Sequence, residues 1–234
     1  MLLLTLVAVV GTFAMVLLQI PVLIALGIAV TVAHFLGFVG LAWVYLQNRG
    51  YDSEQLRSYI GLHTPTVRQL GLVVVGNLVI VALLAVLLGL VEVFSLLPAE
   101  EGTESVQDEL ADLGVGVYLV LVAFMLAVVG PTEEVLYRGV IQNRLREQFS
   151  VVPGIAIASA LFTAIHVQIF LVGTGVLGVV IGFLALFIPS LVLGGVYEYT
   201  ENIVIPSLIH GIHNSLIITV LFFGPSFLAD YVTF

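Results

Sequence analysis

The stretch LGVGVYLVLVAFMLAVVGPTEEVLYRG, residues 113–139, decides the fold class, because a long apolar run leads directly into two acidic residues. No charged side chain lies between Asp112 and Glu133. About 20 apolar residues are enough for an α-helix to cross the hydrocarbon core of a membrane. Glu133, Glu134 and Arg138 therefore belong to a membrane helix. Lipid does not solvate such groups, so charged residues in these positions mark candidate functional sites.

The remaining sequence has the same apolar character. Hydrophobic residues make up 61% of the 234 residues and charged residues 9%, whereas a soluble domain carries roughly 25% charged residues. Residues 1–48 and 148–197 contain no Asp, Glu, Lys or Arg. We therefore expect an all-α, polytopic transmembrane helix bundle that forms a single integral membrane domain over residues 1–234.

Long apolar runs predict about seven spans, within a range of six to eight. They lie near residues 2–20, 22–47, 70–97, 114–147, 151–169, 172–197 and 203–223, with a break expected at Pro189. All six basic residues are arginines of the segments 48–69 and 138–146. One span separates each segment from the acidic loop 98–112, so both lie on the same side. The positive-inside rule makes that side cytoplasmic.

Composition also excludes several function classes. The chain has no cysteine, which excludes disulfides, a thiol nucleophile and a thiolate metal site. Its net charge is -9 and it has no lysine, so it lacks the basic patch of a nucleic-acid-binding protein. The His-Glu-x-x-His run of zinc proteases and the Gly-x-Ser-x-Gly elbow of serine hydrolases are also missing.

Polar groups of later apolar segments fall at matching depths. Glu133 lies 17 residues before Ser150 and His166 lies 16 residues after it. At a rise of about 1.5 Å per residue, both are about 24 Å from the turn between two antiparallel helices. Glu133 and His166 are therefore expected to face each other. His210 and Asn214 are four residues apart and share one face of the last helix.

This combination suits peptide hydrolysis. A carboxylate and an imidazole around one water can act as a general base. A second imidazole and an amide can donate hydrogen bonds to a developing oxyanion. Glu134 and Arg138, four residues apart, are expected to form an ion pair that leaves Glu133 free as the base. The same buried groups could instead serve a transporter or proton-coupled carrier as a relay. His34 is expected to be structural or lipid-facing.

Three motifs in this order resemble those of a known family. Glu133-Glu134-x-x-x-Arg138, Phe162-x-x-x-His166 and His210-x-x-x-Asn214 are similar to the motifs of the CAAX protease and bacteriocin-processing family, intramembrane endopeptidases also known under abortive-infection and self-immunity names. The resemblance covers about residues 113–224. It implies that Glu133 and His166 activate water, that His210 and Asn214 bind the oxyanion, and that Glu134 and Arg138 order the site.

The resemblance leaves the cofactor open. We favour a reaction without a metal, because no pair of ligands has the short helical spacing usual for catalytic zinc. The alternative is a zinc site formed by Glu133, His166 and His210. Expected partners are a peptide or lipidated-protein substrate and the lipid bilayer, and no nucleic acid. The expected location is a prokaryotic cell membrane, which the chain crosses several times.

Overall fold

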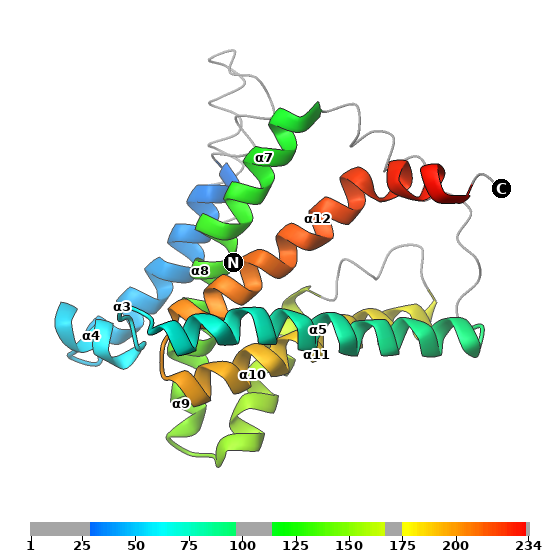
Figure 1. Cartoon of the computed structure of the whole chain (residues 1–234). Coiled ribbons are helices and arrows are strands. Elements are labelled where there is room, and N and C mark those ends of the chain that lie inside the picture. The colour runs from blue at the N-terminus through cyan, green and yellow to red at the C-terminus, as the bar shows by residue number, and fades with distance from the viewer. Residues whose placement is uncertain (1–28, 97–113, 167–174, 233–234) are drawn as a thin grey trace.

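The described part of the protein is helical throughout. The structure is a computed structural model that describes residues 29–96, 114–166 and 175–232 (Figure 1). Seven helices and no strand occur in these ranges, which confirms the predicted all-α class. The first expected span, 2–20, and the acidic loop 98–112 lie outside the described residues.

Five of the described helices are long and apolar enough to cross a membrane. They are Ala29–Asn48, α5 (Val67–Val93), Gly114–Arg146, α11 (Val176–Thr200) and the first part, Val204–Gly224, of α12 (Val204–Val232). The protein is thus an integral, multi-pass membrane protein. The apolar helix α10 (Val151–His166) has 16 residues, about 24 Å at 1.5 Å per residue, which is shorter than a hydrocarbon core of about 30 Å. The number of seven spans therefore stays a prediction.

Local hydrogen bonds set the start of α5. The Thr66 hydroxyl accepts from the backbone N–H of Gln69, and the Gln69 side chain accepts from the backbone N–H of Thr66. This reciprocal capping box begins a helix in the polar residues ahead of the apolar run. The helix therefore begins three residues before the apolar run that predicted a span near residue 70.

Proline does not break the membrane helices in the described ranges. The expected break at Pro189 is wrong, since α11 continues through it. The helix Gly114–Arg146 consists of α7 (Gly114–Phe124), η2 (Met125–Val129), α8 (Gly130–Glu134), η3 (Val135–Gln142) and α9 (Asn143–Arg146). The two η segments are π-helical. Pro131 follows the first of them, where the wider turn relieves the clash that a proline ring makes with the preceding turn. Both glutamates thus lie in a short α-helical stretch between two π-helical ones.

Both arginine-bearing segments meet at one end of the bundle. The helix Ala29–Asn48, which includes η1 (Phe35–Gly40) and α3 (Leu41–Asn48), is followed by α4 (Ser53–Tyr59). Arg49 pairs with Glu147 at 3.2 Å, and the Asn143 amide donates to the carbonyl of Tyr59 at 2.8 Å. The predicted common side of the two segments is therefore confirmed. We call it the arginine-rich end; its assignment to the cytoplasm stays a prediction.

Apolar contacts hold the remaining helices together. In Figure 1, α5 lies across α11 and α12, and these three helices share a buried core. Its members are Val73, Ile80, Leu193, Ile205 and Ile209. Helix α10 packs on α11, and α12 crosses η2 and α8. This last crossing brings the motifs of the sequence together.

Candidate active site

Two glycines allow α8 and α12 to approach within backbone contact. A Cβ atom on Gly130 would lie 2.6 Å from the carbonyl oxygen of Ser207, and one on Gly211 would lie 2.9 Å from the Cα of Leu126. Small residues permit such crossings in membrane proteins, where close packing replaces the hydrophobic effect. His210 directly precedes Gly211, so the crossing places its ring beside the glutamates of α8.

Glu133 lies in the interior with histidines around its carboxylate. The residue is only 5% exposed. Its Oε2 atom is 3.8 Å from Nε2 of His166 and 3.8 Å from Nε2 of His210. The predicted facing of Glu133 and His166 is thus present. A separation of 3.8 Å is too long for a direct hydrogen bond, and it is suited to a water molecule that bridges both groups.

The far nitrogen of each histidine is held by an acceptor. Nδ1 of His166 lies 2.8 Å from the carbonyl of Phe162, and Nδ1 of His210 lies 2.9 Å from Oε1 of Glu134. Carbonyl and carboxylate oxygens only accept, so both Nδ1 atoms carry a proton. The Nε2 atoms are thereby directed at Glu133, because the hydrogen bond of one ring nitrogen determines the role of the other.

The expected ion pair between Glu134 and Arg138 is present and completely buried. The Arg138 Nε atom donates to Oε2 of Glu134 at 2.9 Å, and both side chains are 0% exposed. Arg138 also donates through Nη2 to the Ser190 hydroxyl of α11 at 2.8 Å. Because the other oxygen of Glu134 receives Nδ1 of His210, Glu134 connects the arginine to a histidine of the site. The spacing of four residues predicts the ion pair between Glu134 and Arg138. It does not predict the contact of Arg138 with Ser190 or that of Glu134 with His210.

The ring of Phe162 contacts the rings of both His166 and His210. Its ring stacks on His166 at 4.4 Å between centroids and meets His210 edge-on at 5.8 Å. It also meets Tyr137 edge-on at 4.9 Å, and the guanidinium carbon of Arg138 lies 5.8 Å from its centroid. One ring thus orients side chains from three helices, which gives a physical reason for a phenylalanine one turn before His166.

His34 faces the interior of the bundle. Its Nε2 atom lies 3.4 Å from Oε1 of Glu133, so the lipid-facing alternative is wrong, and the expected structural role does not include this contact with the candidate base. One signal could have found it. His34 is an isolated ionisable side chain in the otherwise uncharged residues 1–48, and such residues within membrane spans usually face the bundle interior. We call Glu133, Glu134, Arg138, His34, His166 and His210 the buried cluster.

Asn214 and His213 have a looser relation to this cluster. Asn214 lies one turn beyond His210 on α12 and is partly buried, in the place that the i, i+4 spacing predicts. His213 is buried, and its Nδ1 atom has no hydrogen-bond partner among the described residues. The oxyanion role of Asn214 stays a prediction.

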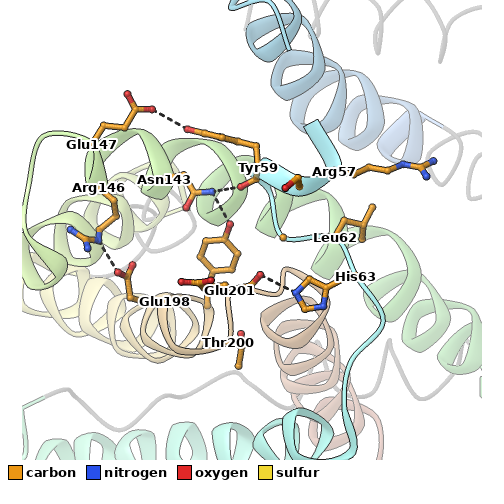
Figure 2. A pocket seen from close by; sticks show the side chains of 13 residues that line it. Arg57, Tyr59, Leu62, His63, Asn143, Arg146, Glu147, Glu198, Thr200 and Glu201 are labelled. Carbon is orange, nitrogen blue, oxygen red and sulfur yellow. Dashed lines mark hydrogen bonds and ion pairs between the residues drawn. The ribbon is translucent and has the colours of Figure 1, made fainter. Parts of the chain in front are cut away.

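A well-formed pocket of the described residues lies away from these side chains. It has a volume of about 680 Å³ and opens at the arginine-rich end (Figure 2). Arg146 pairs there with Glu198, and the Tyr59 hydroxyl donates to Glu147. Burial raises the pKa of Tyr59, so its hydroxyl remains a donor. The lining residues are Arg57, Ser58, Tyr59, Gly61, Leu62, His63, Asn143, Arg146, Glu147, Tyr197, Glu198, Thr200 and Glu201.

This arginine-end pocket does not include the buried cluster. Tyr137 and Gln142 lie between Glu133 and the pocket residue Asn143 along the helix, and both are fully buried.

The cluster as placed is not a ready metal site. Within the described ranges, no three His, Asp or Glu side chains are arranged to hold a metal ion. A zinc ion held by Glu133, His166 and His210 would need these side chains to shift.

A buried carboxylate facing imidazoles inside a helical membrane bundle can serve hydrolysis as a general base or a carrier as a proton relay. Residues 115–216 match the family described as type II CAAX prenyl endopeptidase Rce1-like. This segment, which contains Glu133, His166, His210 and Asn214, is therefore similar to a family of intramembrane proteases. Neither the curated proteins nor the solved structures gave a match.

Proposed function

We propose that the protein is an endopeptidase that hydrolyses a peptide bond within or near the membrane, with Glu133 as the general base. The observation that carries this proposal is the convergence of Nε2 atoms from His166 and His210 on Oε2 of Glu133. Three helices supply these groups, and lipid would solvate none of them. So many polar groups at one buried point are characteristic of a functional site.

The attacking water lies between Glu133 and His166. It donates one hydrogen bond to Oε2 and one to Nε2 of His166, which leaves an oxygen lone pair free for the substrate carbonyl. Glu133 takes the proton as the water oxygen bonds to the carbonyl carbon. Hydrogen bonds of this kind are often long before substrate binds and shorten in the reactive complex, which agrees with the 3.8 Å separations.

His210 and Asn214 stabilise the oxyanion of the tetrahedral intermediate. The Nδ1 proton of His210 is held by Glu134, and in its doubly protonated form Nε2–H is directed to the site. The carboxylates of Glu133 and Glu134 together balance the positive charges of Arg138 and of that imidazolium. Donors that are fixed before the reaction stabilise a developing charge most effectively. When the carbon–nitrogen bond breaks, the proton held by Glu133 passes to the leaving amine.

We propose a reaction without a bound metal. The arrangement supports it in that no three His, Asp or Glu side chains within the described ranges are placed to hold a metal ion. Purified enzyme treated with a strong zinc chelator should retain its cleavage rate, and added zinc should not raise it. A rate that falls with chelator and returns with zinc supports the zinc alternative.

The substrates are peptides or proteins, in keeping with the family, and we propose a membrane-embedded or lipidated chain as the specific class. Small membrane proteins and secreted peptides should be compared in cells that carry the wild-type protein or Glu133→Gln. Substrates accumulate uncleaved only in the variant. Matched synthetic peptides with and without a C-terminal prenyl group then separate lipid recognition from peptide recognition.

Glu133→Gln in detergent-purified protein tests the proposal. The substitution is nearly isosteric and removes the base, so cleavage should fall by about 10²–10⁴-fold with little change in melting temperature. Glu92→Gln is a matched control, because Glu92 is also in a membrane helix, α5, but is exposed. Full activity of Glu133→Gln would overturn the proposal.

A further inference from the structure

His34 comes from a helix that the family match does not include. It lies in Ala29–Asn48, whereas the match covers residues 115–216. The ring is enclosed by Phe38 at 5.2 Å and Phe124 at 5.9 Å between centroids. Its Nδ1 atom lies 2.9 Å from the carbonyl of Val30. Both its plane and its Nδ1 atom are thus fixed, which directs Nε2 at Glu133.

The two oxygens of Glu133 have different partners. Oε1 contacts Nε2 of His34 at 3.4 Å, whereas Oε2 is the oxygen that faces His166 and His210. The terminal torsion of a glutamate is broad and offers little intrinsic preference. An unanchored carboxylate would therefore rotate, and Oε2 would leave the position between the two histidines.

One proton is shared in the contact between His34 and Glu133. The Val30 carbonyl only accepts, so Nδ1 of His34 carries a proton. In a neutral ring Nε2 then has a lone pair, which would face the lone pairs of the carboxylate oxygen. One more proton between the two atoms removes this repulsion. With that proton the contact is an ion pair between an imidazolium and a carboxylate.

We propose that His34 is a positioning residue of the active site, which holds Oε1 of Glu133 so that Oε2 stays directed at the attacking water. The inference rests on the proposed role of Glu133 as the base. It extends the working site to a helix outside the matched segment. Partners of this kind, which orient a reacting group without touching the substrate, typically contribute about 10–100-fold to activity in metal sites, and we expect a similar effect here.

Two substitutions separate positioning from packing. His34→Phe keeps an aromatic ring against Phe38 and Phe124 but has no Nε2 atom. His34→Gln loses the ring but places an amide N–H donor at a similar reach. Leu36→Ala is the matched control, since Leu36 is on the same helix and 52% exposed.

The measurements are kcat, KM and melting temperature with one peptide substrate. We expect His34→Phe to lower kcat by about 10–100-fold with an unchanged KM and melting temperature, and His34→Gln to recover most of the loss. Leu36→Ala should behave as the wild type. Wild-type kcat in His34→Phe overturns the inference. So does an equal loss in both His34 variants that follows their melting temperatures, since packing alone then explains the effect. Activity in Glu133→Gln overturns instead the proposed function.

Discussion

The same helix carries two carboxylate–guanidinium pairs in opposite surroundings. Glu134 and Arg138, four residues apart, are both 0% exposed. Glu147 follows the end of that helix and pairs with Arg49 and Arg144, and its side chain is 33% exposed. Water solvates the second pair and not the first. Local spacing of three residues (Arg144 and Glu147) or four residues (Glu134 and Arg138) occurs in both, so the depth of a pair along the helix, rather than pairing itself, determines its importance.

The arginine-end pocket and the buried cluster also differ in how strongly their charges interact. The arginine-end pocket holds about 680 Å³, yet its charges are paired across a surface that water reaches. Each charge of the buried cluster has a protein partner within 4 Å. Electrostatic interactions are stronger where water is excluded. The polar groups are therefore coupled more strongly in the buried cluster than in this pocket.

Removing one member of the buried pair gives the largest expected loss of stability. Glu134→Gln leaves Arg138 with the Ser190 hydroxyl as its remaining side-chain partner, and an uncompensated buried charge costs about 3–5 kcal/mol. The melting temperature in detergent should fall far more than in Glu133→Gln. Glu147→Gln, the exposed counterpart, should change stability by only about 0–1 kcal/mol. If Glu134→Gln melts like the wild type, the buried pair has no structural role and the contrast between the two pairs fails.

The helix crossing beneath the cluster gives the next largest effect. In Gly130→Ala the new Cβ would lie 2.6 Å from the Ser207 carbonyl, so α12 must shift. Overpacking of this kind typically costs about 1–3 kcal/mol, and His210 moves with α12, so cleavage should also decline. Gly116→Ala serves as control, because its Cβ meets nothing within 4 Å. Equal melting temperatures and rates for the two variants would mean that the crossing does not set the site.

Much of the buried cluster follows from the sequence because helical geometry alone determines depth. Equal distances from one turn place Glu133 opposite His166, and a spacing of four residues pairs Glu134 with Arg138. Neither inference requires knowledge of how distant helices pack. The fold class follows with equal directness, since apolar runs of this length form membrane helices.

The remaining features depend on how each helix is rotated about its axis, which one sequence does not encode locally. The contact of His34 with Glu133 requires the helix Ala29–Asn48 to turn one particular face inward. The bond from Arg138 to Ser190 likewise depends on the rotation of α11. Helix α11 continues through Pro189 while it packs against α5, α10 and α12. Tertiary contacts decide all of these.

A smaller effect is expected from a hydroxyl at the arginine-rich end. The Asn143 amide donates to the Tyr197 hydroxyl at 2.8 Å and has two further acceptors, the carbonyls of Tyr59 and Gly139. Tyr197→Phe removes one of the three and should cost about 0.5–1.5 kcal/mol. The matched variant is Tyr199→Phe on the same helix, whose hydroxyl accepts from Arg68 but which is 65% exposed. A larger loss in Tyr199→Phe than in Tyr197→Phe would contradict the view that burial determines the value of these contacts.

The smallest expected effect belongs to the exposed pair and is visible as a dependence on pH. The hydrogen bond from Arg49 holds the pKa of Glu147 below its ordinary value of 4.5, with Arg144 contributing to the same direction. A carboxylate with a lowered folded-state pKa adds stability above its unfolded pKa and loses it as the pH falls through the folded value. The free energy of unfolding of the wild type should therefore exceed that of Glu147→Gln by about 0–1 kcal/mol at pH 7. This difference should vanish as the pH is lowered well below 4.5.

Melting both proteins in detergent across this pH range isolates the contribution of Glu147, because the two proteins differ only at this residue. High salt should reduce the difference at pH 7, because the charges are exposed and screened. A difference that persists at low pH, or that salt leaves unchanged, would show that Glu147 acts through something other than its charge.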